Sequence, residues 1–218
     1  MLRVAIDGPG GTGKSTIAKA IAEKFQIEYI DTGAMYRAIA LKALNNEVSS
    51  SDESAVKNML KDTEIDFKNS TIYLDGKDVS GLIRTNEISM EASNISKLGC
   101  VREKVNELNK FLASTKNVIM EGRDIGTNVI TDAEVKIFMT AKPEIRAKRR
   151  YNQLLEQGKS ADYDELVKEI EKRDYQDSHR ELNPLKQADD AVLLDTSEMT
   201  FDENVDAVAE IINFKIAE

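Results

Sequence analysis

Apolar residues along this chain follow two alternating patterns. Five short runs are mostly apolar, as is typical of strands buried in a parallel sheet, and they cover residues 2–6, 28–30, 118–120, 135–139 and 191–194. Between these runs the apolar residues recur at helical spacing, as Ile17, Ile21 and Phe25 do. Strands that alternate with helices favour an α/β fold, in which helices cover both faces of a five-stranded parallel sheet.

Polar residues with capping chemistry mark where the helices begin. Asp31, followed by Thr32 and Gly33, offers the start of a helix that runs to about Asn45. Pro143 suits the first turn of another helix. The remaining helices are predicted over about 53–62, 86–98, 101–114, 143–157 and 163–179, with a closing helix around 205–212.

The stretch from about 63 to 86 departs from this alternation. Residues 65–67 and 72–74 flank the turn Asn69–Ser70, and Asp75–Gly76 then turns the chain into residues 77–79. This pattern predicts a small antiparallel meander. Because it interrupts an otherwise alternating β/α pattern, we expect residues 63–86 to form an inserted subdomain.

Composition limits the possible functions. A length of 218 residues suits one domain with a small insertion. The net charge of −9 argues against a nucleic-acid surface, although a pocket that binds a nucleotide can oppose the charge of the whole protein. The single cysteine, Cys100, rules out an intramolecular disulfide. With no signal segment, membrane-length run or sign of an obligate interface, we expect a cytoplasmic monomer with no membrane partner.

Residues 8–15 read Gly-Pro-Gly-Gly-Thr-Gly-Lys-Ser, with a predicted strand before them and a predicted helix after them. This context is the one in which glycine-rich backbone N–H groups and a helix N-terminus hold phosphate. We expect Lys14 to reach the β- and γ-phosphates of a nucleoside triphosphate and the Ser15 hydroxyl to bind Mg²⁺. The expected ATP-binding residues are Gly8, Pro9, Gly10, Gly11, Thr12, Gly13, Lys14, Ser15 and Thr16.

The phosphate loop alone does not separate a switch GTPase, an ATPase and a small-molecule kinase. A GTPase needs an Asn-Lys-x-Asp motif, and the nearest match, at residues 109–112, has Leu112 at the fourth position and lies in a predicted helix. The choice therefore depends on whether the chain carries a second site for an anion.

Polar loops after the second and third strands predict such a site. Thr32 and Arg37 lie about one helical turn apart after the second strand, and Glu121, Arg123 and Asp124 follow the third. Ligands of open α/β sheets bind beyond the carboxyl ends of the strands. The alternative for Arg123 and Asp124 is an ordinary surface ion pair.

Two helices add arginines with the spacing of a shared face. Arg173, Asp177 and Arg180 are spaced i, i+4 and i+7, which suits a sugar and phosphate site but also an ordinary ion pair on a solvated helix. The second set, Arg146, Arg149 and Arg150, precedes a polar break at Gly158. It fits a short lid at about 150–163 that closes arginines over a phosphoryl group, but it also fits a solvated basic face.

Taken together, these segments resemble the bacterial cytidylate kinases over essentially the whole chain. The resemblance rests on residues 6–10, 31–37, 78–84, 121–127 and 173–185, and the segment Gly-Arg-Asp-Ile-Gly-Thr is far more specific than the phosphate loop. It implies a single P-loop kinase domain over residues 1–218, in which the insertion binds the monophosphate. It also implies phosphorylation of CMP, and usually dCMP, by ATP in pyrimidine nucleotide metabolism.

The resemblance assigns roles to individual residues of this chain. It implies that Thr32, Arg37, Arg123 and Arg180 bind the monophosphate, that Ser93, Arg102 and Asp124 read the cytosine, and that Arg173 and Asp177 hold the sugar. The expected catalytic groups, which hold or neutralise the phosphates, are Lys14, Arg123, Arg149, Arg150 and Arg180. The Glu121 carboxylate could hold a water bound to the Mg²⁺ ion of Ser15.

Two other functions stay open. One is a kinase for a different small acceptor, such as UMP or a sugar acid. The other is a P-loop module that binds a nucleotide without transferring a phosphoryl group, although such a module would have no need of a second anion site. A panel of acceptors in an ATP-dependent assay separates the three.

Overall fold

A computed structural model describes residues 1–68 and 71–217 of the chain and confirms the α/β fold. The five-stranded sheet has the order β2-β6-β1-β7-β8. Its strands are β1 (Arg3–Asp7), β2 (Glu28–Asp31), β6 (Val118–Gly122), β7 (Val135–Thr140) and β8 (Val192–Asp195). β7 pairs in parallel with β1 and with β8, and Ile6 lies opposite Ile137 in the first of these pairings.

The predicted helices are also present, within a few residues of their expected ends. They are α1 (Lys14–Phe25), α2 (Thr32–Asn45), α3 (Glu53–Lys61), α4 (Asn86–Ile95), α5 (Gly99–Thr115), α6 (Pro143–Glu156), α7 (Tyr163–His179) and α8 (Phe201–Ala217). The predicted starts are confirmed in detail. The Asp31 carboxylate caps α2 by accepting a hydrogen bond from the Ala34 N–H at 2.9 Å, and Pro143 is the first residue of α6.

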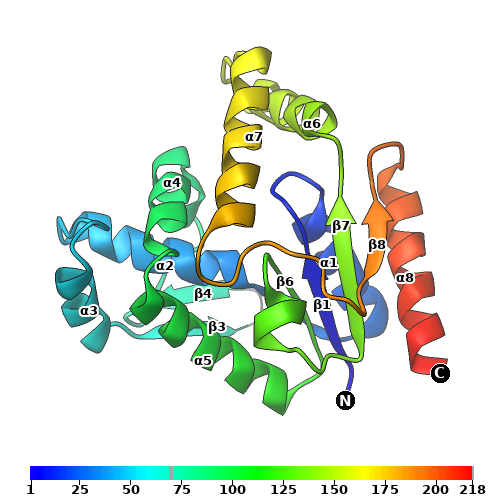
Figure 1. Cartoon of the computed structure of the whole chain (residues 1–218), viewed down its shortest axis with the longest axis horizontal. Helices are drawn as coiled ribbons and strands as arrows, with labels where there is room; N and C mark the ends of the chain where they lie inside the picture. The colour runs from blue at the N-terminus through cyan, green and yellow to red at the C-terminus, as the bar shows by residue number, and fades with distance from the viewer. Residues whose placement is uncertain (69–70, 218) are drawn as a thin grey trace. The chain divides into compact units, whose positions relative to one another are not determined.

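The chain divides into two compact units, and the first combines residues 1–27 with 119–218. Within it, α8 packs against α1 and β7, and α6 and α7 pack against each other (Figure 1). Apolar side chains of the strands and of these helices form its core, and Ile6, Ile21, Ile137 and Ile212 are fully or almost fully buried.

The second unit covers residues 28–118 and contains the predicted meander. Strands β3 (Ile65–Lys68), β4 (Thr71–Leu74) and β5 (Lys77–Asp78) form an antiparallel sheet, and β4 packs against α2 (Figure 1). Asp75 and Gly76 both have positive φ, at 49° and 77°, as a two-residue hairpin turn requires. The turn predicted at Asn69–Ser70 lies outside the described residues.

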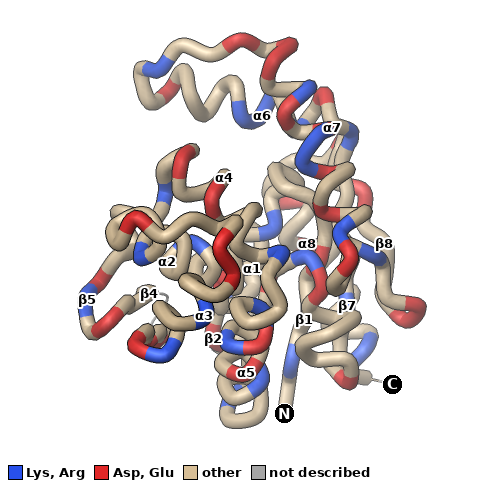
Figure 2. The backbone as a smooth tube through the Cα atoms, turned by 60° about the vertical axis from the view of Figure 1, so that its left-hand side comes forward, with Lys and Arg blue, Asp and Glu red and all other residues tan. Residues whose placement is uncertain are grey.

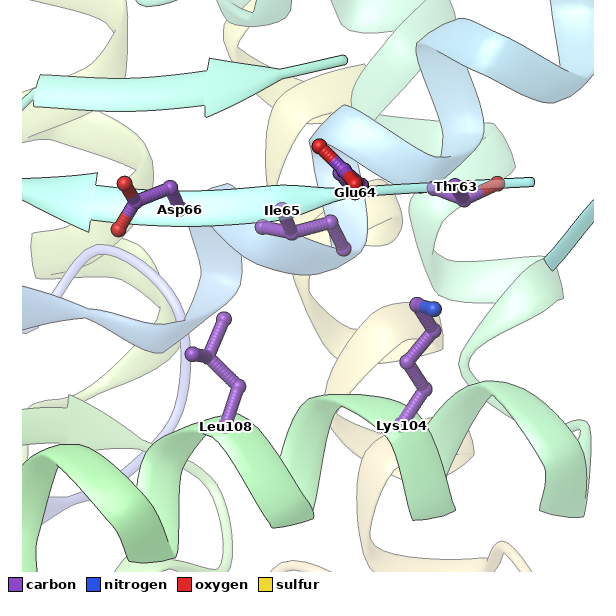
Figure 3. A pocket seen from close by; sticks show the side chains of 6 residues that line it. All are labelled: Thr63, Glu64, Ile65, Asp66, Lys104 and Leu108. Atoms are coloured by element: carbon purple, nitrogen blue, oxygen red, sulfur yellow. The ribbon is translucent and has the colours of Figure 1, made fainter. Parts of the chain in front are cut away.

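A cavity of about 350 Å³ lies between β3 and α5 in this second unit. Figure 3 shows Lys104 and Leu108 of α5 pointing toward the strand that carries Ile65. The Lys104 ammonium donates a hydrogen bond to the Leu60 carbonyl at 3.0 Å, so its placement is explained by the end of α3.

Three features differ from the sequence-based expectation. β8 is not buried on both faces: it lies at one edge of the sheet and its Leu193 side chain is exposed, whereas β2, at the other edge, is almost wholly buried. A short 3₁₀ helix over Leu82–Arg84 and a single π-helical turn over Ile125–Val129 were not predicted. Among the residues that the structure describes, no helix combines the length and the apolar character that a membrane span needs.

Candidate active site

The phosphate loop follows β1 and has a backbone that the glycines make possible. Gly8 has φ 146°, and a Cβ at this position would lie 2.0 Å from the Met139 carbonyl oxygen of β7, so no other residue fits. Gly13 has φ 97° and leads directly into α1. Ser15 and Thr16 lie exposed in the first turn of that helix, where a ligand can reach their hydroxyl groups.

The Lys14 side chain is buried and folds back over this loop. Its ammonium donates hydrogen bonds to the Pro9 carbonyl at 2.6 Å and to the Thr12 hydroxyl at 3.4 Å. Burial, followed by the nearby charge of Arg123, lowers the pKa of Lys14 to about 7. An anion bound in the loop would oppose both effects and favour the charged ammonium.

Arg123 and Asp124 follow β6, and each is bound by a residue from the end of α7. Arg123 Nε donates to Asp177 at 2.8 Å, and Arg180 Nη2 donates to Asp124 at 2.8 Å. In the second pair each side chain is only 9% exposed. Neither pair is therefore the solvated surface pair that was the alternative for this motif.

Asp177 is held in its charged form by the arginines around it. Burial alone would raise the pKa of this carboxyl group, but the charges of Arg123, Arg173 and Arg180 outweigh burial and keep the pKa below its usual value. The prediction that an arginine keeps this carboxylate ionised is thus confirmed, although Arg123 contributes most.

The shared helix face predicted for Arg173, Asp177 and Arg180 is only partly correct. α7 ends at His179, and Arg180 already has extended backbone, with φ −65° and ψ 145°. Arg180 Nε donates instead to the Asn183 carbonyl at 2.7 Å, and this bond turns the guanidinium back toward Asp124. Arg173 and Asp177 do share a face of α7.

The three arginines expected to act alike on α6 lie in different surroundings. Arg146 is buried: it donates to the Gly10 carbonyl of the phosphate loop at 3.0 Å and forms an ion pair with Asp174 of α7. Arg149 donates to the Thr196 carbonyl at 2.6 Å, and Arg150 donates to the Gln153 side chain at 2.9 Å. Helix α7 packs against α6 and carries both basic and acidic residues along its length (Figure 2).

Sequence reasoning missed Asp174, which binds Arg146, and Asn128, whose amide donates to Asp124 at 3.0 Å. The only available signals were an acidic residue next to Arg173 and a polar residue four positions after Asp124. Neither signal is specific, because the same spacings are common on solvated surfaces.

The other predicted residues belong to the second unit. Thr32 is buried at the start of α2, and Arg37 donates to the Asp31 carboxylate at 2.7 Å. The buried Arg37 Nε has no hydrogen-bond partner among the described residues, so this N–H group can still donate to a ligand.

Ser93 and Arg102 are linked through Ser96, which lies between α4 and α5. The Ser96 hydroxyl donates to the Ser93 carbonyl at 3.0 Å, and Arg102 Nη1 donates to the Ser96 carbonyl at 3.3 Å. The Arg102 guanidinium also lies over the Tyr36 ring, 5.8 Å from its centre. Both bonds use backbone carbonyls, so they hold the Arg102 guanidinium at the end of α4 and do not involve the Ser93 hydroxyl.

The described residues contain no cluster of three or more histidine, cysteine or acidic side chains that could hold a metal ion. Among the oxygen groups near the phosphate loop, the Ser15 hydroxyl and the buried Glu121 carboxylate are the two expected to serve Mg²⁺, and Glu121 lies close enough to Lys14 to affect its pKa. The Asp7 carboxylate next to Gly8 already accepts hydrogen bonds from the Ile125 and Gly126 N–H groups. Such a sparse donor set fits Mg²⁺ bound mainly by the phosphates of a nucleotide and by water.

Comparisons with known proteins agree on one family. A family model described as cytidylate kinase matches residues 4–214. The cytidylate kinase of Lactobacillus johnsonii is 50% identical, over 99% of this chain and 95% of that protein. That of Caldicellulosiruptor saccharolyticus is 47% identical, over 96% of this chain and 95% of that protein.

A solved structure shows the same fold at low sequence identity. The shikimate kinase of Bacteroides thetaiotaomicron superposes with a TM-score of 0.50 and 15% identity, over 97% of this chain and 98% of that one. This likeness concerns the fold alone.

Proposed function

The chain belongs to the cytidylate kinase family, and from this premise we infer that it transfers the γ-phosphoryl group of ATP to CMP, giving CDP and ADP. The observation that best supports this reaction is the position of Arg123. A Cβ at Gly10 of the phosphate loop would lie 3.4 Å from Arg123 Nη2. A guanidinium thus lies directly beside the loop expected to hold the donor phosphates, where an acceptor phosphate needs a partner.

The donor half consists of residues 8–16. The loop N–H groups and Lys14 would hold the β- and γ-phosphates. Ser15 would hold Mg²⁺, with Glu121 acting through a water molecule. When bound, this ion supplies neutralising charge for the β- and γ-phosphate oxygens.

For the acceptor half we propose the roles that the family resemblance implies. Thr32, Arg37, Arg123 and Arg180 bind the monophosphate, and Arg173 and Asp177 bind the sugar. The ionised state of Asp177 supports its role, because a carboxylate can accept hydrogen bonds from two sugar hydroxyls. The antiparallel insertion at about 63–86 is proposed as the subdomain that closes on the monophosphate.

Base recognition is proposed for Ser93, Arg102 and Asp124. Cytosine presents an amino donor and an unprotonated ring nitrogen, whereas uracil presents a carbonyl and an N–H at the same positions. Carboxylate and hydroxyl oxygens can accept from the amino group, and a guanidinium can donate to the ring acceptor. A site built this way rejects UMP because its own polar groups would lose their partners.

The transfer needs no general base, since the attacking oxygen of CMP is already anionic. Catalysis then consists of alignment and charge stabilisation. We propose that Arg37, Arg123 and Arg180 hold the acceptor phosphate in line. Arg149 and Arg150 would neutralise charge on the phosphoryl group in transit. A lid at about 150–163 would exclude water, which would otherwise compete as acceptor.

A coupled assay of ADP release tests the proposal with a panel of CMP, dCMP, UMP, AMP and shikimate. We expect CMP and dCMP to give the highest kcat/KM values of the panel. Preference for UMP or shikimate would establish a different acceptor. Binding of ATP without acceptor-dependent release of ADP would establish a non-catalytic module.

We also propose a cytoplasmic monomer, and light scattering of the purified protein with and without nucleotide tests the monomeric state.

A further inference from the structure

Asp7 connects the phosphate loop to the loop that carries Arg123 and Asp124. It is the last residue of β1, directly precedes Gly8 and is only 5% exposed. Its carboxylate accepts two hydrogen bonds, one from the Ile125 N–H and one from the Gly126 N–H, both at 2.8 Å. These two N–H groups begin the π-helical turn that follows Asp124.

Both oxygens of Asp7 are used as acceptors, so a neutral amide would not serve equally well. Burial raises the pKa of Asp7 to about 6, although the two backbone N–H groups and the charge of Lys14 act in the opposite direction. A carboxylate offers both oxygens as acceptors, whereas the amide of asparagine would turn its NH₂ group toward one of the two N–H donors.

The surroundings of Asp7 leave its carboxylate little room to move. A Cβ at Gly126 would lie 3.4 Å from the Asp7 Oδ2 atom and 3.2 Å from the Lys136 side chain. The charged groups that act on Asp7 are Lys14, which favours its ionised form, and Asp124, which opposes it. Lys136 directs its own ammonium to Asp190 at 2.7 Å.

We propose that Asp7 is a positioning residue that fixes the Arg123–Asp124 loop to the end of β1, and so sets where the acceptor-binding groups lie relative to the phosphate loop. It contacts neither nucleotide and acts through the backbone of the turn at Ile125. This inference rests on the proposed function of Arg123 and Asp124.

The kinetic test is Asp7→Asn, compared with wild type and with Asp195→Asn as a matched control. Asp195 ends β8 as Asp7 ends β1, and its carboxylate also accepts two hydrogen bonds, but both come from Ser197 in the exposed turn that follows. For Asp7→Asn we expect kcat/KM for CMP to fall at least tenfold, while the Kd of ATP, measured by titration calorimetry, stays within twofold of wild type. Asp195→Asn should leave both within twofold.

A second measurement uses the wild-type protein and so does not depend on the variant folding. The amide resonances of Ile125 and Gly126 should titrate together between pH 5 and 7 as Asp7 takes up a proton, because a protonated carboxyl group loses one of its two acceptor sites. Amides of α8 serve as the reference that should not move.

The outcomes separate the inference from the function on which it rests. A wild-type protein that does not phosphorylate CMP refutes the proposed function. If the wild type is active, the positioning role is refuted by normal CMP kinetics in Asp7→Asn, by an equal loss of ATP affinity and CMP kinetics, or by amides of Ile125 and Gly126 that do not titrate at any pH at which the protein stays folded.

Discussion

Replacing Asp177 by asparagine tests how strongly the end of α7 is tied to the loop after β6. The substitution keeps the size of the side chain and removes its charge. Arg123 would then lose the carboxylate that it contacts through Nε at 2.8 Å, while its guanidinium stays largely enclosed. The expected result is a loss of stability and a weaker hold on the sugar.

The size of the stability loss follows from the burial of the pair. Breaking a fully buried ion pair costs about 3–5 kcal/mol. The Arg123 and Asp177 side chains are 20% and 11% exposed, so solvent screens part of the lost interaction, and an amide oxygen can still accept a hydrogen bond. We therefore expect the free energy of unfolding to fall by about 2 kcal/mol at pH 7.

The pH dependence provides a second check with a definite sign. The folded-state pKa of Asp177 lies below its usual value, so its ionised form stabilises the fold above the unfolded-state pKa, which is about 3.9. This stability is lost as the pH falls through the folded-state pKa. The difference between wild type and Asp177→Asn should be complete at pH 7 and should shrink below about pH 4.

Urea unfolding at pH 7 and at several values between 3 and 5 measures both effects, and equal m-values show that the unfolding transitions are comparable. Glu171→Gln is the matched control, because Glu171 is an exposed carboxylate in the middle of the same helix. A loss below about 0.5 kcal/mol at pH 7 in Asp177→Asn, which is the spread of ordinary surface substitutions, refutes the reasoning. A loss that persists undiminished at pH 3 refutes it as well.

Three further substitutions test the proposed nucleotide sites. Arg180→Ala should lower kcat/KM for CMP by about 10²- to 10³-fold in the ADP-release assay, the loss typical of one preorganised donor, and near-normal turnover would contradict a phosphate clamp. Lys14→Met should abolish turnover. The folded-state pKa of Lys14 is lowered to about 7, so above that pH the unfolded wild-type chain binds more protons than the folded one. The free energy of unfolding of wild type should therefore rise relative to that of Lys14→Met between pH 7 and 10. A difference between the two free energies of unfolding that stays constant over this range, measured by chemical unfolding, would contradict the prediction. Asn128→Leu removes the donor that holds the second oxygen of Asp124 and should reduce the preference for CMP over UMP by about tenfold; an unchanged ratio of the two kcat/KM values would mean that Asn128 does not orient the base-reading carboxylate.

The strands, helices and turns could be predicted because their signals are local. Asp31 and Pro143 mark the starts of α2 and α6, and Asp75–Gly76 marks a hairpin turn with two positive φ angles. The exposed edge strand β8 could not be distinguished from a buried one by its apolar run. Edge position depends on which strands pair, and those contacts join residues far apart in the chain.

The residue types of the candidate site could be predicted from the sequence, but the ion pairs and hydrogen bonds between these residues could not. Arg123 and Asp124 were chosen for their place after a strand, yet their ion-pair partners are Asp177, in the last turn of α7, and Arg180, which directly follows that helix. Arg146 and Arg149 have equivalent positions in a charge pattern. Only the packing of α6 against the phosphate loop and α7 decides that Arg146 becomes buried and paired.

If Arg123 binds the acceptor phosphate as proposed, its pair with Asp177 explains how an acidic protein can hold an arginine ready for an anionic substrate. A guanidinium has five N–H donors in a rigid planar group, so a carboxylate that binds one donor also fixes the direction of the remaining donors. Arg123 contacts Asp177 through Nε, and its Nη2 atom lies on the side of Gly10. A phosphate that binds beside the phosphate loop therefore meets a donor that is already oriented. The carboxylate offsets the charge of Arg123 in the free protein, so that the cost of burying the guanidinium is met before the substrate arrives.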